Sequence, residues 1–382
     1  LLDMPSDRKI HRQPIPRTGG IALGGAYMVS LVIFGFSEGL WWYLAGGIAL
    51  FLMGAVDDHR SIRWPVKLVV ELAVSFIIIF RFIGDVTSIS FFTSSLSFSN
   101  IVLIAVFLIW FVGILNAVNL IDGMDGLAGG FMLLITVFAI LMGIVSSNDY
   151  FVIVNFLLLG ALVGFLLFNR KPAKFFMGDS GSLILGYHVA CLPLLFHQFS
   201  GEVGKLEITP FLILSALLIM DTTRVFFSRV LRGKNPMNAD TIHLHHLVYK
   251  ETNSYMGTLI PIFSVTLMSG LGSVLFFVYG FGYLAMQLFL LLLIIFVVTP
   301  PVPFYVPLAS RLTRTIGRLK TSRFSNKHLF RVRYIPLLGL MYLLTLGFQV
   351  TAFPKFTDLP LELMVGGILL AVFSLTNWKK EE

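Results

Sequence analysis

Long apolar runs recur along the whole chain, and they limit what it can fold into more than any other feature. Twelve of them are long enough, or nearly so, to cross the ~30 Å hydrocarbon core of a bilayer as helices. The predicted spans are 20–36, 40–56, 64–84, 101–116, 127–145, 151–168, 182–199, 208–228, 257–279, 281–300, 334–352 and 362–378. Because backbone polar groups find no water inside a bilayer, the pattern predicts an all-α polytopic integral membrane protein with about 12 transmembrane helices.

The composition supports the same class of protein. Hydrophobic residues make up 57% of the 382 residues and charged residues only 13%, about half the charged fraction of a soluble domain. The mean hydropathy is +0.87. The chain opens on a polar basic segment, residues 1–17, without a signal peptide, and we expect a further helix upstream of it.

The basic residues are distributed unevenly between the two sides of the predicted membrane. A net charge of +8 and a pI of about 9.6 would also suit a nucleic-acid-binding protein. If the spans alternate, however, all but three of the 28 Lys and Arg residues fall on the side of the N-terminal segment. The exceptions are Arg81, Lys205 and Lys355. The positive-inside rule therefore places this side in the cytoplasm, and no nucleic-acid partner is expected.

The cytoplasmic side also carries the longer polar segments. They cover 1–19, 57–63, 117–126, 169–181, 229–256 and 301–333. We interpret the basic segment 301–333 as an anchor near anionic lipid headgroups. On the outer side only 85–100 is long, and its Ser, Thr and Phe residues predict a small hairpin.

Adjacent carboxylates, Asp57 and Asp58, follow the predicted span 40–56 at its cytoplasmic end. The helix dipole disfavours negative charge there, and the two carboxylates repel each other. Neutralisation by Arg60, Arg63 or Lys67 is one explanation. Metal binding or catalysis is the favoured one, because carboxylates at membrane depth are usually functional.

A second polar cluster contains Asn116, Asn119, Asp122 and Asp125 in a segment without Lys or Arg. The two Asp residues share a face if this turn is helical. Capping of the next helix could explain Asp125 alone. The whole cluster favours a cation or a hydrogen-bonding ligand.

A third cluster runs from Asn169 to Ser182 and includes Phe176 and Asp179. Asp179 stands where the next helix is predicted to begin, so it either caps that helix or serves a ligand. The neighbouring glycines, Gly178 and Gly181, would leave backbone N–H groups free to cradle a phosphate. Phe176 could stack on a base, although packing is the commoner role of a single Phe.

A fourth cluster is formed by His243, His245 and His246. On a helix the first and last of these would share a face. Contact with phosphate fits better than zinc binding, because no Cys lies nearby. Upstream, Asp221 and Arg224 are one helical turn apart and predict an internal ion pair.

Taken together, carboxylates, basic residues and histidines on one membrane face suit Mg²⁺, or Mn²⁺, with phosphate chemistry. Four motifs in order then resemble the polyprenyl-phosphate N-acetylhexosamine-1-phosphate transferases, or glycosyltransferase family 4. This family includes undecaprenyl-phosphate GlcNAc-1-phosphate transferases and phospho-MurNAc-pentapeptide translocase. The motifs are Arg8 to Gly20 leading to Asp57 and Asp58, the run 116–126, the run 169–182, and the His cluster.

The resemblance covers residues 1 to about 300 and implies a transmembrane transferase core over 1–300. The basic loop and two further helices would fill 301–382. The resemblance implies Mg²⁺ held by Asp179 with Asp125. It assigns catalysis to Asp57, Asp58, Asp122, Asp125, His243, His245 and His246. It assigns substrate binding to Lys67, Asn116, Asn119, Asn169, Phe176 and Arg17.

The implied reaction takes a UDP-N-acetylhexosamine and a polyprenyl phosphate, such as undecaprenyl phosphate, to polyprenyl-diphosphate-HexNAc and UMP. UDP-GlcNAc is the first choice of donor, although Thr241 stands where many relatives have a basic residue, and this leaves the sugar open. The implied location is the inner, or plasma, membrane with a cytoplasmic active site, at the start of a cell-envelope polysaccharide. Relatives form dimers, so a homodimer is a further expectation.

Two other kinds of protein share some of these features. An intramembrane prenyltransferase also uses Asp-rich Mg²⁺ motifs, but the spacing of Asn119, Asp122 and Asp125 is tighter than in those enzymes. A transporter would place its ionisable residues near the middle of the membrane. It is favoured only if Asp57, Asp122 and Asp179 lie far apart or at that depth.

Overall fold

The computed structural model describes residues 2–3, 14–35, 38–82, 85–91, 94–97, 99–200, 204–231, 233 and 242–279. The chain divides into two units, and apart from the last residues of α9 everything below belongs to the first, Leu1–Val225 with Met237–Ala285. The predictions for 281–300, 301–333, 334–352 and 362–378 lie outside the described residues.

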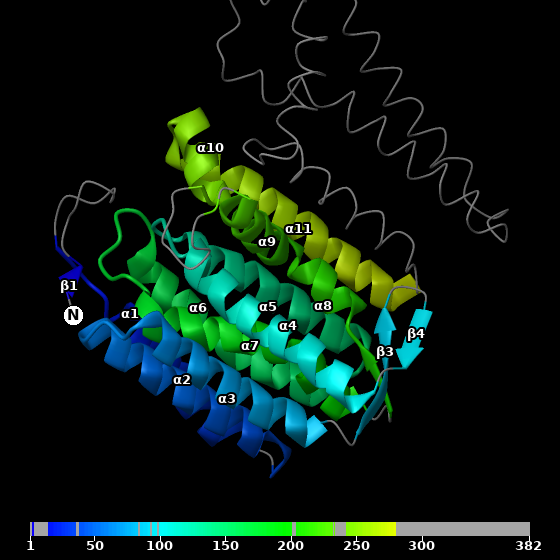
Figure 1. The fold of residues 1–382 in the computed structure, drawn as a ribbon. Coiled ribbons are helices and arrows are strands. Elements are labelled where there is room, and N and C mark those ends of the chain that lie inside the picture. The colour runs from blue at the N-terminus through cyan, green and yellow to red at the C-terminus, as the bar shows by residue number, and fades with distance from the viewer. Residues whose placement is uncertain are drawn as a thin grey trace, which may run out of the picture. The chain divides into compact units, whose positions relative to one another are not determined.

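Helices form most of the described structure (Figure 1). They are α1 (Gly19–Ser30), α2 (Trp41–His59), α3 (Trp64–Phe82), α4 (Asn100–Ile121), α5 (Leu127–Val145), α6 (Asp149–Asn169), α7 (Gly178–Ser200), α8 (Thr209–Leu214), α9 (Ala216–Leu231), α10 (Leu244–Thr252) and α11 (Tyr255–Tyr279). By length and composition, α4, α5, α6, α7 and α11 could each cross a membrane. The described region therefore supports a multi-pass helical membrane protein.

Several helix boundaries differ from the predicted spans. α5 covers the predicted range, whereas α4 runs on to Ile121 and α7 begins at Gly178. Asn116 and Asn119 are therefore helical, and Asp179 lies in the first turn of α7. The predicted span 208–228 is broken by a turn at Ser215 into α8 and α9.

A small sheet corrects the all-α prediction. β3 (Val86–Phe91) and β4 (Ser94–Ser97) pair antiparallel, which confirms the predicted hairpin. β5 (Gly204–Glu207), from the loop after α7, joins β3 in parallel and was not predicted. Backbone groups beyond the helix ends need partners, and strand pairing supplies them. A second, two-stranded pairing joins β1 (Leu2–Asp3) and β2 (Ile15–Pro16).

α7 is the central helix, because it packs against α1, α2 and α4 and is the most buried of the five long apolar helices. Small residues along α7 allow this close approach. Halfway along it, buried His188 forms hydrogen bonds with the hydroxyl of Tyr43 (2.7 Å) and with Oδ1 of Asn155 (3.0 Å). These contacts join α2, α6 and α7 through satisfied polar groups, an arrangement that the sequence analysis did not foresee.

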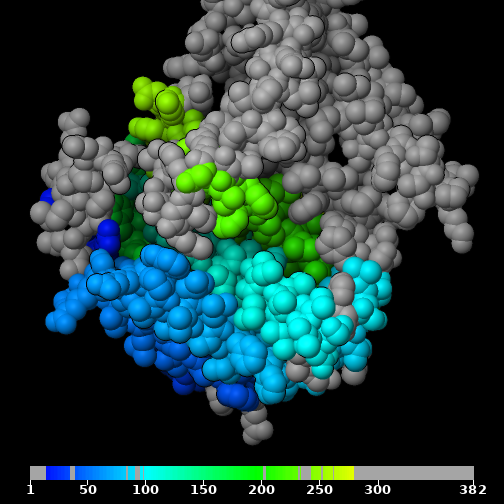
Figure 2. Space-filling view, viewed as in Figure 1, coloured from blue at the N-terminus to red at the C-terminus, as the bar shows by residue number. Residues whose placement is uncertain are grey.

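Large apolar side chains are exposed on the outer faces of the helices. Val69 and Ile77 on α3 and Ile109 on α4 each expose more than 60% of their surface. In Figure 2, residues of α2 and α3 (blue) continue into β3 and α4 (cyan) as one surface. An apolar face of this kind suits contact with lipid rather than with water.

Candidate active site

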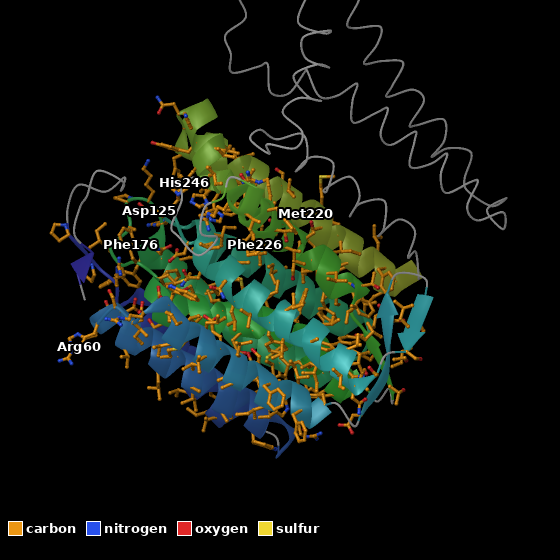
Figure 3. All side chains as sticks on the ribbon, viewed as in Figure 1. Arg60, Asp125, Phe176, Met220, Phe226 and His246 are labelled. Atoms are coloured by element: carbon orange, nitrogen blue, oxygen red, sulfur yellow. The ribbon has the colours of Figure 1, made fainter. Side chains whose placement is uncertain are left out.

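The predicted site residues gather at one end of the helices, which we call the polar end. α2, α4 and α6 end there, whereas α3, α5, α7 and α11 begin there, and β3 and β4 lie at the opposite end (Figure 1). Asp125, Phe176 and His246 are labelled at this end in Figure 3. Alternating helix directions therefore bring loops that are distant in sequence to one place.

Lys67 joins two of the acidic motifs. Its Nζ lies 2.7 Å from Oδ2 of Asp57 and 2.5 Å from Oδ2 of Asp179. The backbone N–H of Ile62 donates to the other oxygen of Asp57 at 2.6 Å. Lys67 lies in the first turn of α3, and Asp57 lies in the last turn of α2, so the short connection between the two helices brings the ammonium to the carboxylate. Of the basic residues weighed for neutralising Asp57, Lys67 is the one that pairs with it.

Asp58 has a different environment from its neighbour, because its carboxylate caps α7. It is 7% exposed and accepts hydrogen bonds from the backbone N–H of Asp179 (2.8 Å) and from the N–H (3.0 Å) and hydroxyl (2.7 Å) of Ser180. Gly178 has φ +68°, and a Cβ there would lie 2.5 Å from Asp58 Oδ1. A carboxylate at a helix N-terminus is electrostatically favourable.

This cap corrects two predictions about the third motif. The N–H groups of Asp179 and Ser180 are occupied by Asp58, so they do not form an open phosphate cradle. Asp179 does not cap α7 either, and its side chain turns to Lys67 instead. The predicted catalytic role of Asp58 stays a prediction, although its contacts are those of a structural group.

The turn after α4 is not helical, so Asp122 and Asp125 do not share a helix face. Asp125 Oδ2 accepts from the backbone N–H of Ala173 at 3.1 Å, and its carbonyl accepts from the Tyr255 hydroxyl at 2.6 Å. Gly126, with φ +68°, precedes α5 in the capping position that was considered for Asp125.

Asn169 completes the link between this turn and the segment before α7. Its Oδ1 accepts from the N–H of Gly126 at 2.9 Å, and its Nδ2 donates to the carbonyl of Phe175 at 2.8 Å. Phe176 is held through its backbone, which pairs with Pro16 and Gly19. Asn169 is 3% exposed, so its amide positions the two loops.

Asp122 lies among other charges. Burial raises the pKa of its carboxyl to about 7, and the carboxylates of Asp179 and Asp58 act in the same direction. Arg17 opposes this shift, which places its charge within reach of Asp122. A carboxyl with such a pKa changes its charge near neutral pH.

Glu71 also belongs to this end, although the sequence did not single it out. This residue is 3% exposed on α3, one helical turn after Lys67, and its Oε2 accepts from Nδ2 of Asn116 at 2.8 Å. Asn119, also on α4, donates to the hydroxyl of Ser182 at 3.0 Å. A carboxylate inside an apolar helix was the available signal for Glu71.

The His cluster is arranged differently from the helical prediction. His243 is extended, with φ −61° and ψ 153°, and precedes α10, so it does not share a helix face with His246. The rings of His243 and His245 are nearly parallel, with centroids 6.2 Å apart, and those of His245 and His246 are 4.1 Å apart. Burial and the nearby His246 lower the pKa of His245 to about 3.

His245 also joins the His cluster to the turn after α4. Its Nε2 lies so close to Gly123 that any side chain there would collide with it. The predicted ion pair of Asp221 with Arg224 is confirmed at 2.6 Å.

The arrangement can place two carboxylates, an ammonium and an imidazole cluster around a phosphorylated ligand. Among the described residues, no three His, Cys, Asp or Glu side chains converge on one point. A divalent cation at Asp57 and Asp179 would therefore depend on phosphate or water oxygens for its other ligands, which is the usual coordination of Mg²⁺. The described contacts bring Asp57, and not Asp125, beside Asp179.

Comparison with known proteins shows which family the chain resembles. The profile of glycosyl transferase family 4 matches residues 40–197. A probable undecaprenyl-phosphate N-acetylglucosaminyl 1-phosphate transferase of Bacillus subtilis is 32% identical over 249 residues, 64% of this chain and 68% of the relative. An undecaprenyl-phosphate alpha-N-acetylglucosaminyl 1-phosphate transferase of Thermotoga maritima is 31% identical, and the match covers 71% of this chain and 80% of the relative's length.

A phospho-N-acetylmuramoyl-pentapeptide-transferase of Listeria welshimeri is 32% identical, and the match covers 60% of this chain and 74% of the relative's length. These relatives extend the match beyond the profile, across most of their own length. The chain belongs to glycosyl transferase family 4.

Proposed function

We propose that this protein transfers N-acetylhexosamine-1-phosphate from a UDP-sugar to a membrane polyprenyl phosphate. An oxygen of the lipid phosphate attacks the phosphorus that carries the sugar, the bond from this phosphorus to the bridging oxygen breaks, and UMP leaves. UDP-GlcNAc and undecaprenyl phosphate are the proposed substrates, since relatives that use N-acetylglucosamine and undecaprenyl phosphate by name match the chain. The product would begin a cell-envelope polysaccharide.

The observation that carries this proposal is the meeting of Asp57, Lys67 and Asp179 at the polar end. Phosphoryl transfer requires positioning and charge neutralisation rather than a covalent catalyst. An ammonium between two carboxylates provides a group for the phosphates and oxygen ligands for a cation. The same contacts count against a transporter, whose ionisable residues would bind at mid-membrane.

Mg²⁺ is the proposed cofactor, with Mn²⁺ as a substitute. Asp179 and Asp57 would hold it, because hard cations prefer carboxylate oxygens and substrate phosphates. When bound, the metal supplies positive charge to the diphosphate. Lys67 would then move from the carboxylates to a phosphate oxygen.

An apolar cavity supports the lipid substrate. It has a volume of about 270 Å³ and lies between α4 and the α8–α9 region. Ile89 and Ile208 line it near the sheet, whereas Thr222, beside Asp221 in the chain, lines it toward the polar end. Such a cavity would accommodate part of an isoprenoid chain whose phosphate reaches the carboxylates.

The polar end would face the cytoplasm of a bacterial inner, or plasma, membrane. Arg60, Arg63, Arg170 and Lys171 belong to its loops, in agreement with the positive-inside rule. UDP-sugars are cytoplasmic metabolites, so the donor would meet the site directly.

The test is a transferase assay with purified protein in detergent, undecaprenyl phosphate, Mg²⁺ and radiolabelled UDP-GlcNAc. We expect label in lipid and release of UMP. We also expect EDTA and Asp179→Asn to reduce turnover by about 10²-fold or more. Asp149→Asn is the matched control, because Asp149 is exposed at the start of α6, away from the polar end, and should keep wild-type turnover.

Turnover with a different UDP-HexNAc would change the proposed sugar and keep the reaction. Absence of turnover with every UDP-HexNAc, from folded protein, would overturn the proposed function.

A further inference from the structure

Asp221 on α9 makes three contacts that together hold His243. Its Oδ1 accepts from the Arg224 guanidinium at 2.6 Å and from the backbone N–H of Leu244 at 3.0 Å. Its Oδ2 lies 2.9 Å from Nδ1 of His243. Arg224 also donates to the carbonyl of Ile242 at 2.7 Å, so the segment before α10 is fixed on both sides of His243.

These contacts determine where the imidazole proton lies. Asp221 receives donors at Oδ1 and acts as an acceptor throughout, so the hydrogen bond at Oδ2 requires a proton on Nδ1 of His243. The other ring nitrogen, Nε2, is then left for another partner. His243 is 3% exposed, and within the described residues its Nε2 has no hydrogen-bond partner.

The unpartnered nitrogen lies within the His cluster that reaches the acidic turn. The His243 ring is parallel to that of His245, whose own Nε2 lies against Gly123 between Asn119 and Asp125. Among the residues that the structure describes, the charged and titratable groups placed around His243 are Asp221 and Arg224 from α9 and His245 and His246 from α10. A buried polar atom without a partner is costly, so a ligand that hydrogen-bonds to Nε2 gains affinity.

We propose that Asp221 is a positioning residue that holds the Nδ1 proton of His243, so that Nε2 of this imidazole is presented to a phosphate oxygen of the UDP-sugar. When the ring carries a proton on each nitrogen, Nε2 donates to the phosphate oxygen and Asp221 is the counter-ion. This role rests on the proposed transferase function and adds a residue that neither the motifs nor the resemblance assigned to the site.

Asp221→Asn is the decisive variant, because the existing contacts determine how the amide must lie. Arg224 and the backbone N–H of Leu244 need an acceptor where Oδ1 of Asp221 now lies, so the carbonyl oxygen of the Asn takes this position. Its NH₂ group then faces Nδ1 of His243. The ring must then accept at Nδ1 and carry its proton on Nε2. The shape of the site is preserved, while the positive charge next to the phosphate is lost.

The first measurement is the ¹⁵N NMR spectrum of His-labelled protein in detergent, with the His243 signals identified by their absence from His243→Asn. We expect a protonated Nδ1 in the wild type, and a shift of the Nε2 signal when UDP-GlcNAc is added. We expect an unprotonated Nδ1 in Asp221→Asn. A wild-type His243 without a proton on Nδ1 would overturn the proposal, whether or not the protein has transferase activity.

The second measurement is steady-state kinetics in the transferase assay. Asp221→Asn should lower kcat by about 10²-fold with KM for UDP-GlcNAc changed less than about threefold, and Asp221→Glu should restore most of kcat. The double variant with Asp221→Asn and His243→Asn should lower kcat no further than His243→Asn alone, because Asp221 acts through His243. Additive losses, or equal losses in the Asn and Glu variants, would contradict the role.

If the wild type shows no transfer with any UDP-HexNAc, the proposed function fails. The NMR result then still decides whether Asp221 sets the His243 proton.

Discussion

Lys67 illustrates how one side chain determines the charge balance of the site. Its ammonium pairs with Asp57 and Asp179, two carboxylates that would otherwise repel each other. A cation that enters between these carboxylates must compete with the lysine. Loss of the lysine should therefore strengthen cation binding while it weakens catalysis.

Lys67→Met tests this competition. We expect Mn²⁺ to bind about tenfold more tightly without substrate, as followed by electron paramagnetic resonance, because one positive charge near the carboxylates has been removed. Turnover should fall by about 10²-fold. Arg63→Met, in the connection just before α3, is the matched control, and it should leave both values unchanged. Unchanged Mn²⁺ affinity in Lys67→Met would show that the lysine does not compete with the metal.

Asp122 predicts a dependence of stability on pH. Burial raises the pKa of its carboxyl from 3.8 to about 7, so the folded protein binds this proton more tightly than the unfolded chain does. The contribution of Asp122 to stability is therefore most favourable below about pH 4, falls between pH 4 and 7, and is lost above pH 7.

Asp122→Asn should remove this contribution. In thermal unfolding without substrate or metal from pH 4 to 8, the difference between variant and wild-type unfolding temperatures should grow in favour of the variant toward pH 7. A constant difference across this range would mean that Asp122 does not titrate there.

At the scale of the helices, the contact between α2 and α7 sets the position of the carboxylates. Asp58 on α2 caps α7, and this cap places Asp179 beside Lys67. The approach is possible because Gly54 faces α7 without a side chain: a Cβ there would lie 2.6 Å from the backbone nitrogen of Ser180. The cap and the close contact thus belong to one feature of the packing.

Gly54→Ala should therefore separate the two helices. We expect a loss of about 1–3 kcal/mol, measured as a lower unfolding temperature in detergent, together with reduced turnover because Asp58 is displaced. Gly160→Ala is the control on α6, where a Cβ would meet open space and should not destabilise the helix. Equal unfolding temperatures for the wild type and Gly54→Ala would contradict the tight contact.

At the scale of the whole first unit, the decisive property is the separation of the polar end from the end that carries β3, β4 and β5 (Figure 1). Ser61 is exposed in the loop between α2 and α3, and Ser95 is exposed on β4. Cys191 is buried, so it should react slowly with thiol reagents. Single cysteines at the two serines can therefore report the orientation.

In cells that express the Cys191→Ala background, a membrane-impermeant maleimide should label Ser95→Cys directly. It should label Ser61→Cys only after permeabilisation, because basic loops remain in the cytoplasm. The reverse pattern would overturn the proposed orientation and the cytoplasmic site.

The sequence alone predicted the helical membrane class, a hairpin within 85–100 and the Asp221–Arg224 ion pair. These features depend on local properties: apolar length, strand propensity and one-turn spacing. The motifs also led to the correct family, because their order along the chain is a sequence property. The sequence did not predict which partner each polar group would find.

Only the tertiary structure decided those partners, since the groups that meet are far apart in the chain and several contacts would satisfy each of them. The neighbouring residues Asp57 and Asp58 have different partners: Asp57 pairs with the ammonium of Lys67, whereas Asp58 caps α7. Asn169 and Asp125 hold two loops together, Glu71 finds Asn116, and Asp221 finds His243. A buried polar group without a partner costs free energy, so the sequence determined that these groups need partners, and helix packing determined which ones they find.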